Sequence, residues 1–473
     1  LLVFLKHNGR IMKIKMKGAL LRSALIAALG GFLFGFDTAV ISGAESTLNE
    51  IFEPTYISWS GVFGTVSFWH GFTVASALIG TIIGSLIFGK PADIFGRKQM
   101  LFVLGALYFI SAIGSALAFN CQFFVVMRFI GGLAVGGSSV VAPMYNAEIS
   151  PARYRGRMVA LTQFNIVFGI MFAYFTNFII NSMDLGEVTW RWMFGVEALP
   201  ALAFFLLLFL NPRSPRWLVG KGLLEEARTV INKLGADKEN TDQEINEIRE
   251  SLMAEKHALK ERFFQARYLK NILLAITIAA FNQLSGINAV LYYAPRVFEM
   301  AGFAQSSAML SSVVIGFVML VFTLIAMMII DHFGRKKLML YGSIGYIISL
   351  SAIAVTFFIN KEGFSDLGGI VVLVSLIVFI AAHGFGQGAV IWVFISEIFP
   401  NRVRARGQAL GSFTHWFMAA LISWTFPVFA EISGGVIFSF YAFCMVLQLL
   451  WVLFKMPETM GIPLEELQKK QGL

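Results

Sequence analysis

The chain has 473 residues, of which 57% are hydrophobic and only 14% are charged, and its mean hydropathy is +0.73. An average soluble domain is about 45–50% apolar and about 25% charged, so a soluble protein of this composition would lack the polar surface to cover itself. The two cysteines, Cys121 and Cys444, lie in apolar runs, which excludes a disulfide framework and a metal cluster. The composition therefore predicts an integral membrane protein.

Twelve apolar runs are long enough to cross a bilayer, which takes about 20 mostly apolar residues in a helix. They form two groups of six: 20–43, 62–89, 99–119, 122–145, 157–180 and 191–210, then 271–298, 306–330, 337–359, 368–395, 407–430 and 434–455. The runs are continuously apolar rather than alternating, which favours helices over the strands of a membrane barrel. The sequence thus predicts an all-α membrane protein with two six-helix halves.

The polar stretch between the two groups is the one long segment expected outside the membrane. Apolar residues recur in it at helical spacing, as at Leu223, Ala227 and Val230, which predicts short amphipathic helices. We therefore divide the chain into an N-terminal segment (1–19), a first half (20–211), a helical linker (212–270), a second half (271–456) and a tail (457–473).

Lys and Arg residues gather on one side of the predicted membrane. Of the 37, all but Arg128, Arg191, Arg296 and Lys361 fall in the termini, the linker, the loops of that side or the adjoining end of a span. Under the positive-inside rule, this places both termini and the linker in the cytoplasm. The loops of the other side carry acids: Glu45, Glu50, Glu53, Asp184 and Glu187. The net charge of +9 therefore reflects topology, and we expect no nucleic-acid partner.

Two strings in the first half are repeated at matching loops of the second half. Asp93–Lys98 (DIFGRK) is echoed by Asp331–Lys336 (DHFGRK). Glu148–Arg157 (EISPARYRGR) is echoed by Glu397–Arg406 (EIFPNRVRAR). Paired repeats of six spans are typical of secondary transporters that bind their substrate between the two halves.

The charged residues of these strings have two interpretations. Acids and arginines at the ends of neighbouring helices can form ion pairs that latch one conformation and release when the halves rock. The alternative is that they only set the topology of the loops. The candidate cytoplasmic latch consists of Asp93, Arg97, Glu148, Arg153, Arg155, Asp331, Arg335, Glu397, Arg402 and Arg404.

Two charged residues fall deep inside predicted spans, Asp37 in the first and Arg128 in the fourth. A carboxylate within the membrane is costly and is by default a functional candidate, with the arginine as its natural partner. Burial raises the pKa of a carboxyl group, whereas a neighbouring arginine lowers it. If conformational change alters the distance between the two groups, the carboxyl group binds and releases a proton. The alternative is a permanent buried ion pair.

Several motifs resemble those of the sugar porter family of the major facilitator superfamily. They follow the family order along nearly the whole chain: Gly35–Gly43 (GFDTAVISG), Arg128–Gly132 (RFIGG), Pro143–Glu148 (PMYNAE), Ser214–Leu218 (SPRWL), Gln283–Asn288 (QLSGIN) with Tyr292 and Tyr293, Ser396–Pro400 (SEIFP) and Pro457–Thr459 (PET). Within the family, bacterial proton-coupled pentose and hexose symporters of the D-xylose type are similar. The resemblance implies the major facilitator fold, and it implies that Tyr292 and Tyr293 are gating residues.

The resemblance also bears on the role of Asp37. Proton-coupled members carry Asp at this position, whereas passive facilitators commonly carry Asn. This favours import of a monosaccharide by proton symport over passive facilitation, with Asp37 and Arg128 as the coupling pair. The proton is then the coupling ion, and we expect no cofactor.

A sugar site needs amide side chains, which both donate and accept hydrogen bonds, and an aromatic plate. Gln283 and Asn288 are about 140° apart on an ideal helix, so they converge only if the helix loosens near Gly286. A lone amide in a membrane helix often bonds only to a neighbouring helix. By their places in the family pattern, the candidate sugar contacts are Gln163, Asn282, Gln283, Asn288, Trp392, His415, Trp416 and His383.

Several positions depart from the family pattern. Asn282 replaces the usual first Gln of a Gln-Gln pair, and Met319 stands where xylose-type symporters and animal glucose carriers have Asn. His383 and His415 resemble residues of animal fructose carriers, although these lack a Trp matching Trp392. The two histidines therefore indicate fructose or another hexose as substrate, or else they are helix-packing donors.

Functions of other classes are weaker alternatives. A membrane enzyme needs a paired base and nucleophile or a metal cluster, and the sequence offers neither. A non-transporting sugar receptor typically carries a long cytoplasmic tail, whereas this chain ends shortly after its last span. A polyol carrier is an alternative among transporters. We expect a multi-pass protein of the bacterial inner membrane that functions as a monomer, with a monosaccharide and the lipid bilayer as its partners.

Overall fold

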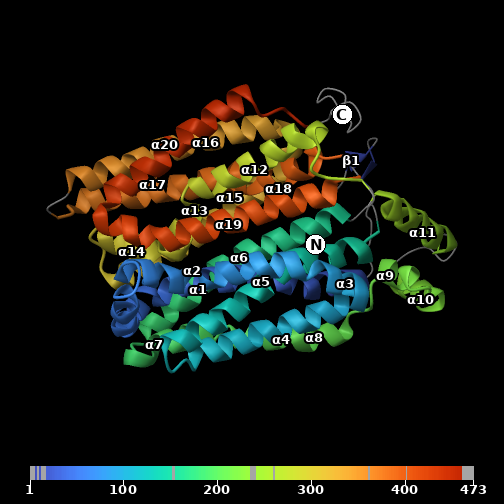
Figure 1. Ribbon diagram of the computed structural model, residues 1–473, viewed down its shortest axis with the longest axis horizontal. Helices are drawn as coiled ribbons and strands as arrows, with labels where there is room; N and C mark the ends of the chain where they lie inside the picture. Colours follow the sequence, from blue (N-terminus) through green and yellow to red (C-terminus); the bar gives the residue numbers. More distant parts are fainter. Residues whose placement is uncertain are drawn as a thin grey trace.

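The computed structural model describes residues 18–151, 155–234, 241–258, 261–360, 363–400 and 402–460, together with 6–7 and 10–11. Among these residues, twelve helical segments are long and apolar enough to cross a membrane, as predicted. Six precede the linker and six follow it, so the expected all-α fold of two six-helix halves is confirmed. Figure 1 shows the two halves packed along their length, the first in blue to green and the second in yellow to red.

The first half contains the longest helix of the described chain and a sixth span made of several pieces. Its helices are α1 (Gly18–Ser60), α2 (Val66–Ile87), α3 (Gly89–Phe95), α4 (Arg97–Ala116), α5 (Cys121–Ile149), α6 (Arg155–Ser182), α7 (Thr189–Gly195) and α8 (Ala198–Leu207). Short 3-10 turns at Gly186–Val188 and Leu208–Leu210 complete the sixth span.

The second half has two interrupted spans. Its helices are α12 (Leu269–Leu284), α13 (Ile287–Tyr292), α14 (Ala294–Met300), α15 (Gln305–Phe333), α16 (Arg335–Ile359), α17 (Asp366–Phe385), α18 (Gln387–Ile398), α19 (Arg404–Ile432) and α20 (Gly434–Phe454). A 3-10 turn at Ala266–Tyr268 leads into α12. The seventh span breaks at Gly286, whose φ is +83°, a conformation that glycine adopts without steric cost. The tenth span breaks at Gly386.

Three short helices connect the halves: α9 (Pro215–Gly220), α10 (Leu224–Leu234) and α11 (Thr241–Ala258). The hydroxyl of Ser214 accepts a hydrogen bond from the N–H of Trp217 and so caps α9. These helices lie at one end of the molecule, and α7 and α14 lie at the other (Figure 1). We call these the linker end and the distal end. A hairpin of two short strands, β1 (Lys6–His7) and β2 (Arg10–Ile11), precedes α1.

The prediction of where the first span ends was wrong in one consequential respect. The apolar run stops at residue 43, but α1 continues to Ser60, so the predicted loop acids Glu45, Glu50 and Glu53 lie on a helix. The helix continues because Ala44, Leu48 and Phe52 recur every fourth residue and form a buried face. Glu45 itself is only 1% exposed.

Glycines allow the helices that carry the buried charges to approach closely. A Cβ atom on Gly132 of α5 would lie 1.8 Å from the backbone oxygen of Ala77 on α2. A Cβ atom on Gly35 of α1 would lie 1.8 Å from the backbone oxygen of Ile166 on α6. Small residues are the common means by which membrane helices pack backbone against backbone. These contacts fix the axial positions of α1 and α5, and hence of Asp37 and Arg128.

We expect Gly132→Ala to destabilise the protein by about 1–3 kcal/mol, because the added methyl group forces α5 away from α2. Gly89→Ala is the matched control, since a Cβ atom there has no neighbour within 4 Å. Thermal unfolding of the detergent-solubilised variants measures the difference. Equal melting temperatures for the two variants would contradict the close packing of α2 and α5.

Candidate functional site

Asp37 of α1 and Arg128 of α5 form a buried ion pair inside the first half. Nη1 of Arg128 lies 2.5 Å from Oδ1 of Asp37, and Nη2 donates to the backbone oxygen of Asp37 at 3.1 Å. The arginine side chain is 1% exposed and the aspartate 2%. The guanidinium also lies 5.3 Å from the ring centre of Phe194. Arg128 therefore has the carboxylate, a carbonyl oxygen and an aromatic face as partners.

Glu197 is a third ionisable group of this site, which the sequence reasoning missed. It directly precedes α8, is 1% exposed and lies within electrostatic range of Asp37 and Arg128. Among the residues that the structure describes, its Oε1 atom has no hydrogen-bond partner. The signal that could have found it is an acid inside the sixth apolar run, which is as costly there as Asp37 is in the first.

The three amides of the seventh span form one hydrogen-bonded cluster. Nε2 of Gln283 donates to Oδ1 of Asn282 at 2.9 Å, and Nδ2 of Asn288 donates to Oε1 of Gln283 at 2.8 Å. All three side chains are buried. They converge because the chain turns at Gly286 between α12 and α13, as the spacing of Gln283 and Asn288 required.

Aromatic side chains border this amide cluster. Nε2 of Gln283 lies 3.3 Å from both ring nitrogens of His415 on α19. The His415 ring is 5.0 Å from the ring of Trp392 on α18 and 4.8 Å from that of Trp416. Trp416 in turn lies 5.4 Å from Phe34 of α1, so the group of rings reaches the first half. The structure thus places six of the eight candidate sugar contacts together.

The other two candidates lie outside that cluster. His383 of α17 is buried, and its Nδ1 lies 2.6 Å from the hydroxyl of Tyr346. That hydroxyl donates to Gln387, which contacts Gln448, so the printed hydrogen bonds of His383 lead to a neighbouring polar network of the second half rather than directly to the amides. Gln163 of α6 is half-buried in the first half, whereas the amides belong to the second half.

The two candidate gating tyrosines end helix α13. Tyr293 is fully buried, its hydroxyl donates to the backbone oxygen of Ser423 at 3.0 Å, and its ring lies 4.9 Å from that of Phe426. Tyr292 is 1% exposed and lies within electrostatic range of Asp37 and Arg128 in the other half. Helix α13 therefore carries Asn288 toward the amide cluster and Tyr292 toward the buried ion pair.

The repeated strings form equivalent ion pairs at the linker end of each half. In the first half, Nη2 of Arg97 lies 2.9 Å from Glu148 and 2.8 Å from Asp93, and Nη1 donates to the backbone oxygen of Ala92 at 3.0 Å. The hydroxyl of Ser214, which caps α9, donates to Glu148 at 2.5 Å. The contact connects the linker to the spans.

The second half repeats this arrangement. Nη2 of Arg335 lies 2.8 Å from Glu397, and Nη1 donates to the backbone oxygen of Ile330 at 3.0 Å. The hydroxyl of Thr459 takes the place of Ser214 and donates to Glu397 at 2.6 Å. Each of these pairs joins helices of one half and not the two halves to each other.

The remaining latch candidates differ in what the structure describes. Nε of Arg404 donates to the backbone oxygen of Phe399 at 3.4 Å, and Arg402 lies 3.9 Å from Glu261 of the linker. Arg153 lies outside the described residues. The side chains of Arg155 and Asp331 are likewise outside the described part of the chain, although helices α6 and α15 contain their backbones.

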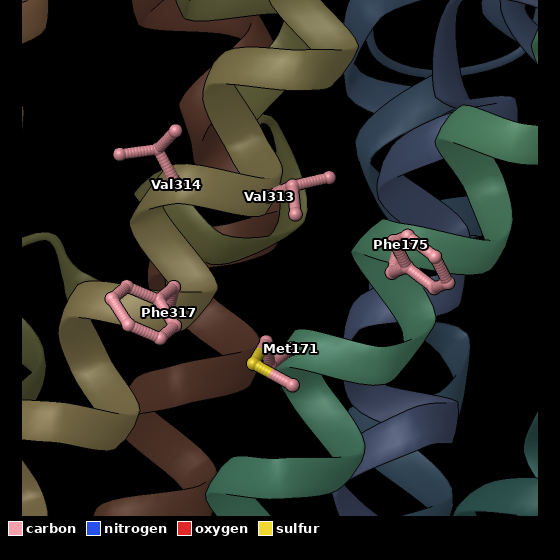
Figure 2. A pocket seen from close by; sticks show the side chains of 5 residues that line it. All are labelled: Met171, Phe175, Val313, Val314 and Phe317. Carbon is pink, nitrogen blue, oxygen red and sulfur yellow. The ribbon is translucent and has the colours of Figure 1, made fainter.

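Two hollows in the described part of the chain are lined by other residues than the polar site. One of about 330 Å³ lies between α6 and α15 and is lined by Met171, Phe175, Val313, Val314 and Phe317. Figure 2 shows these side chains, all of them apolar, on two helices that belong to different halves. Such a surface suits lipid chains rather than a sugar. Among the described residues, no group of three or more His, Cys, Asp or Glu side chains could hold a metal ion.

Residues 23–470 match the family model described as "Sugar (and other) transporter". The chain belongs to this family. It is 38% identical to the D-xylose-proton symporter of Escherichia coli strain K12, over 94% of both chains. It is also 33% identical to the arabinose-proton symporter of Bacillus subtilis, over 98% of both, and 35% identical to a glucose transport protein of Synechocystis, over 93% of this chain and 95% of the relative.

Solved structures give the same result. The xylose transporter XylE of E. coli in a partially occluded inward-open conformation matches with a TM-score of 0.82, at 34% identity, over 94% of this chain and 100% of that one. XylE bound to 6-bromo-6-deoxy-D-glucose matches with a TM-score of 0.77, at 36% identity, over 96% and 99% of the two chains. The implied family and fold are thus confirmed: the protein is a sugar porter of the major facilitator fold, a multi-pass membrane transporter and not an enzyme.

Arg128→Met is expected to lower stability by about 3–5 kcal/mol, because it leaves the carboxylate of Asp37 buried without its cation. Adding Asp37→Asn to the same chain removes that uncompensated charge, so the double variant is expected to regain part of the loss. Thermal unfolding in detergent measures both effects. A double variant no more stable than Arg128→Met would show that the two side chains are not energetically coupled.

Proposed function

We propose that this chain imports a monosaccharide, D-xylose or a related pentose or hexose, together with a proton. The observation that supports coupling to a proton is the buried pair of Asp37 and Arg128, since an ionisable carboxyl group is otherwise too costly inside a membrane protein. Relatives that are 38% and 33% identical to this chain are named as proton symporters of xylose and arabinose, respectively.

Arg128 is arranged so that Asp37 can gain and lose a proton. When the carboxylate is neutralised, the guanidinium keeps the backbone oxygen of Asp37 and the ring of Phe194 as partners. Protonation of Asp37 therefore does not leave an unpaired buried cation, which lowers the cost of the step.

Both members of the pair belong to the first half, so rigid rocking of the halves does not by itself separate them. What changes around them is the second half. Helix α13 packs against α1 and brings Tyr292 close to the pair, while Asn288 on the same helix joins the amide cluster. We therefore assign to α13 the coupling between sugar binding and the protonation of Asp37.

The energy available from the proton is sufficient for accumulation. One elementary charge that crosses 100 mV contributes about 2.3 kcal/mol, which is enough for a roughly fifty-fold sugar gradient before any pH difference is added. A coupled carrier therefore concentrates its sugar, whereas a passive facilitator with the same binding site only equilibrates it.

The sugar is recognised by the amide cluster and its aromatic border in this proposal. Asn282, Gln283 and Asn288 supply donors and acceptors for hydroxyl groups, and Trp392 supplies a face for the apolar side of the ring. Hexose or fructose transport is the alternative substrate assignment. The observation that favours it is His415, whose ring touches Gln283 and so adds an imidazole to the cluster.

The distribution of basic residues supports an orientation in the bacterial inner membrane. The linker end carries the linker and the Arg-containing repeats, so the positive-inside rule assigns it to the cytoplasm together with both termini. The distal end is then the external end. Each half supplies one side of the candidate site, so a single chain is sufficient for transport, and we propose that the monomer is the functional unit.

Asp37→Asn is expected to abolish accumulation of D-xylose against its gradient while sugar exchange across the membrane continues, because the amide cannot carry the proton. Uptake and counterflow of labelled D-xylose in proteoliposomes, with and without a proton gradient, measure the two activities. Asp184→Asn, in a distal turn, is the matched control, because Asn tolerates its φ of +47°. Accumulation by Asp37→Asn would exclude Asp37 as the coupling group.

Gln283→Ala is expected to weaken D-xylose binding by about 10-fold or more, since it removes the amide that contacts Asn282, Asn288 and His415 and leaves their polar groups unpaired. Gln305→Ala, at the exposed start of α15, is the control. The KM for exchange and the binding isotherm of the purified protein report the change. An unaltered KM would place the sugar elsewhere.

A further inference from the structure

A second buried cluster of charged and polar side chains lies at the distal end, apart from the site described above. Oε1 of Glu45 on α1 lies 2.6 Å from Nε2 of His70 on α2 and 2.7 Å from Nη1 of Arg296 on α14. The side chains of Glu45 and His70 are 2% and 1% exposed, whereas that of Arg296 is 21% exposed. The proposed mechanism uses none of these three residues.

We propose that the Glu45–Arg296 ion pair is a latch that holds the distal end closed, and that His70 positions the carboxylate for it. Glu45 and His70 belong to the first half and Arg296 to the second. A sugar that enters from the distal side requires the two halves to part at that end, so this ion pair breaks and re-forms once in each transport cycle.

Other contacts between the halves lie beside the ion pair. The hydroxyl of Ser67, at the start of α2, donates to Glu431 at the end of α19. Nε1 of Trp424 on α19 donates to the backbone oxygen of Phe68 at 3.0 Å. The backbones of α2 and α19 approach closely here, since a Cβ atom on Gly71 would lie 2.0 Å from the backbone oxygen of Trp424. The distal end is therefore closed by a packed seam between α2 and α19. The Glu45–Arg296 ion pair is the buried charged contact beside this seam.

The two partners of Glu45 have different parts in the latch. Opening removes Arg296 together with the second half, and a buried carboxylate left without any partner would strongly disfavour the open state. His70 moves with Glu45 because both belong to the first half, so the carboxylate keeps one hydrogen-bond donor when the gate opens. Arg296, which is already partly exposed, reaches water directly as the halves separate. The cluster thus combines a permanent partner with a removable one.

The strength of this latch sets how often the distal end opens, and so it influences the rate of transport rather than the identity of the sugar. The inference rests on transport by this chain but not on proton coupling. Its test therefore includes a readout that needs no transported sugar.

The test measures exposure of the seam with a cysteine reporter. Ser67→Cys keeps a small side chain at a position that is 4% exposed and touches Glu431 of the other half. The natural thiols Cys121 and Cys444, both buried, are first replaced by alanine. The rate of reaction of the purified, detergent-solubilised protein with a hydrophilic maleimide then reports how often the distal end opens.

Glu45→Gln and Arg296→Gln are each expected to raise the labelling rate several-fold, and the double variant is expected to label no faster than the faster single variant. Arg191→Gln is the matched control: Arg191 is also near the distal end, but it donates to the backbone oxygens of Ala116 and Ala118 within the first half. If Glu45→Gln does not fold, Arg296→Gln, whose side chain is partly exposed, decides the result alone.

His70 has its own readout as a positioning residue. His70→Leu is expected to raise the labelling rate, and His70→Gln, which restores a donor to the carboxylate, is expected to return it toward that of the reporter chain. Unchanged labelling in Glu45→Gln and Arg296→Gln would overturn the latch, as would an equal acceleration by Arg191→Gln. Absence of D-xylose uptake by the unaltered chain would instead count against the proposed substrate and leave the labelling result standing.

Discussion

The structure depends on one electrostatic constraint: a charge buried in a protein surrounded by lipid is costly unless it has a partner. Asp37 is bound by Arg128, and Glu45 is bound by both His70 and Arg296. A transporter adds a further demand, because its halves move and every partner from the opposite half is lost in some state. Whether two partners belong to the same half therefore decides what each buried pair can do.

At the linker end, the charged residues of the repeated strings find their partners within the same half. Arg97 joins Glu148 in the first half, and Arg335 joins Glu397 in the second, with a hydroxyl group on each glutamate. These contacts keep each bundle rigid without tying it to the other. The contacts of Arg296 and Glu431 with the first half lie instead at the distal end.

Hydropathy predicted the twelve spans in two groups of six because lipid requires long apolar runs and makes exceptions such as Asp37 conspicuous. It could not place Glu45, since α1 continues beyond its apolar run on a buried face that repeats every fourth residue. It also could not predict that His383 bonds to Tyr346 rather than to the amides. A helix that is apolar on all sides gives no periodic signal for its rotation, so the partner of a single polar residue depends on packing. Glu197 was missed although the same cost argument that identified Asp37 applies to it.

The distinction between pairs within a half and pairs between halves explains why two buried clusters are needed. Asp37 and Arg128 belong to the same half, so rocking of the halves would not separate them. A change of conformation would instead alter which side chains of the second half lie near the pair, such as Tyr292 on α13. A pair of this kind can bind a proton in one state and retain its geometry. Glu45 and Arg296 belong to different halves, so the same motion would separate them, and their pair suits the proposed gate. If one cluster served both purposes, every opening of the proposed gate would disrupt the group that is proposed to carry the proton. Asp37 and Glu45 lie on the same helix, α1, which packs against α13, so one helix carries the acid of each cluster.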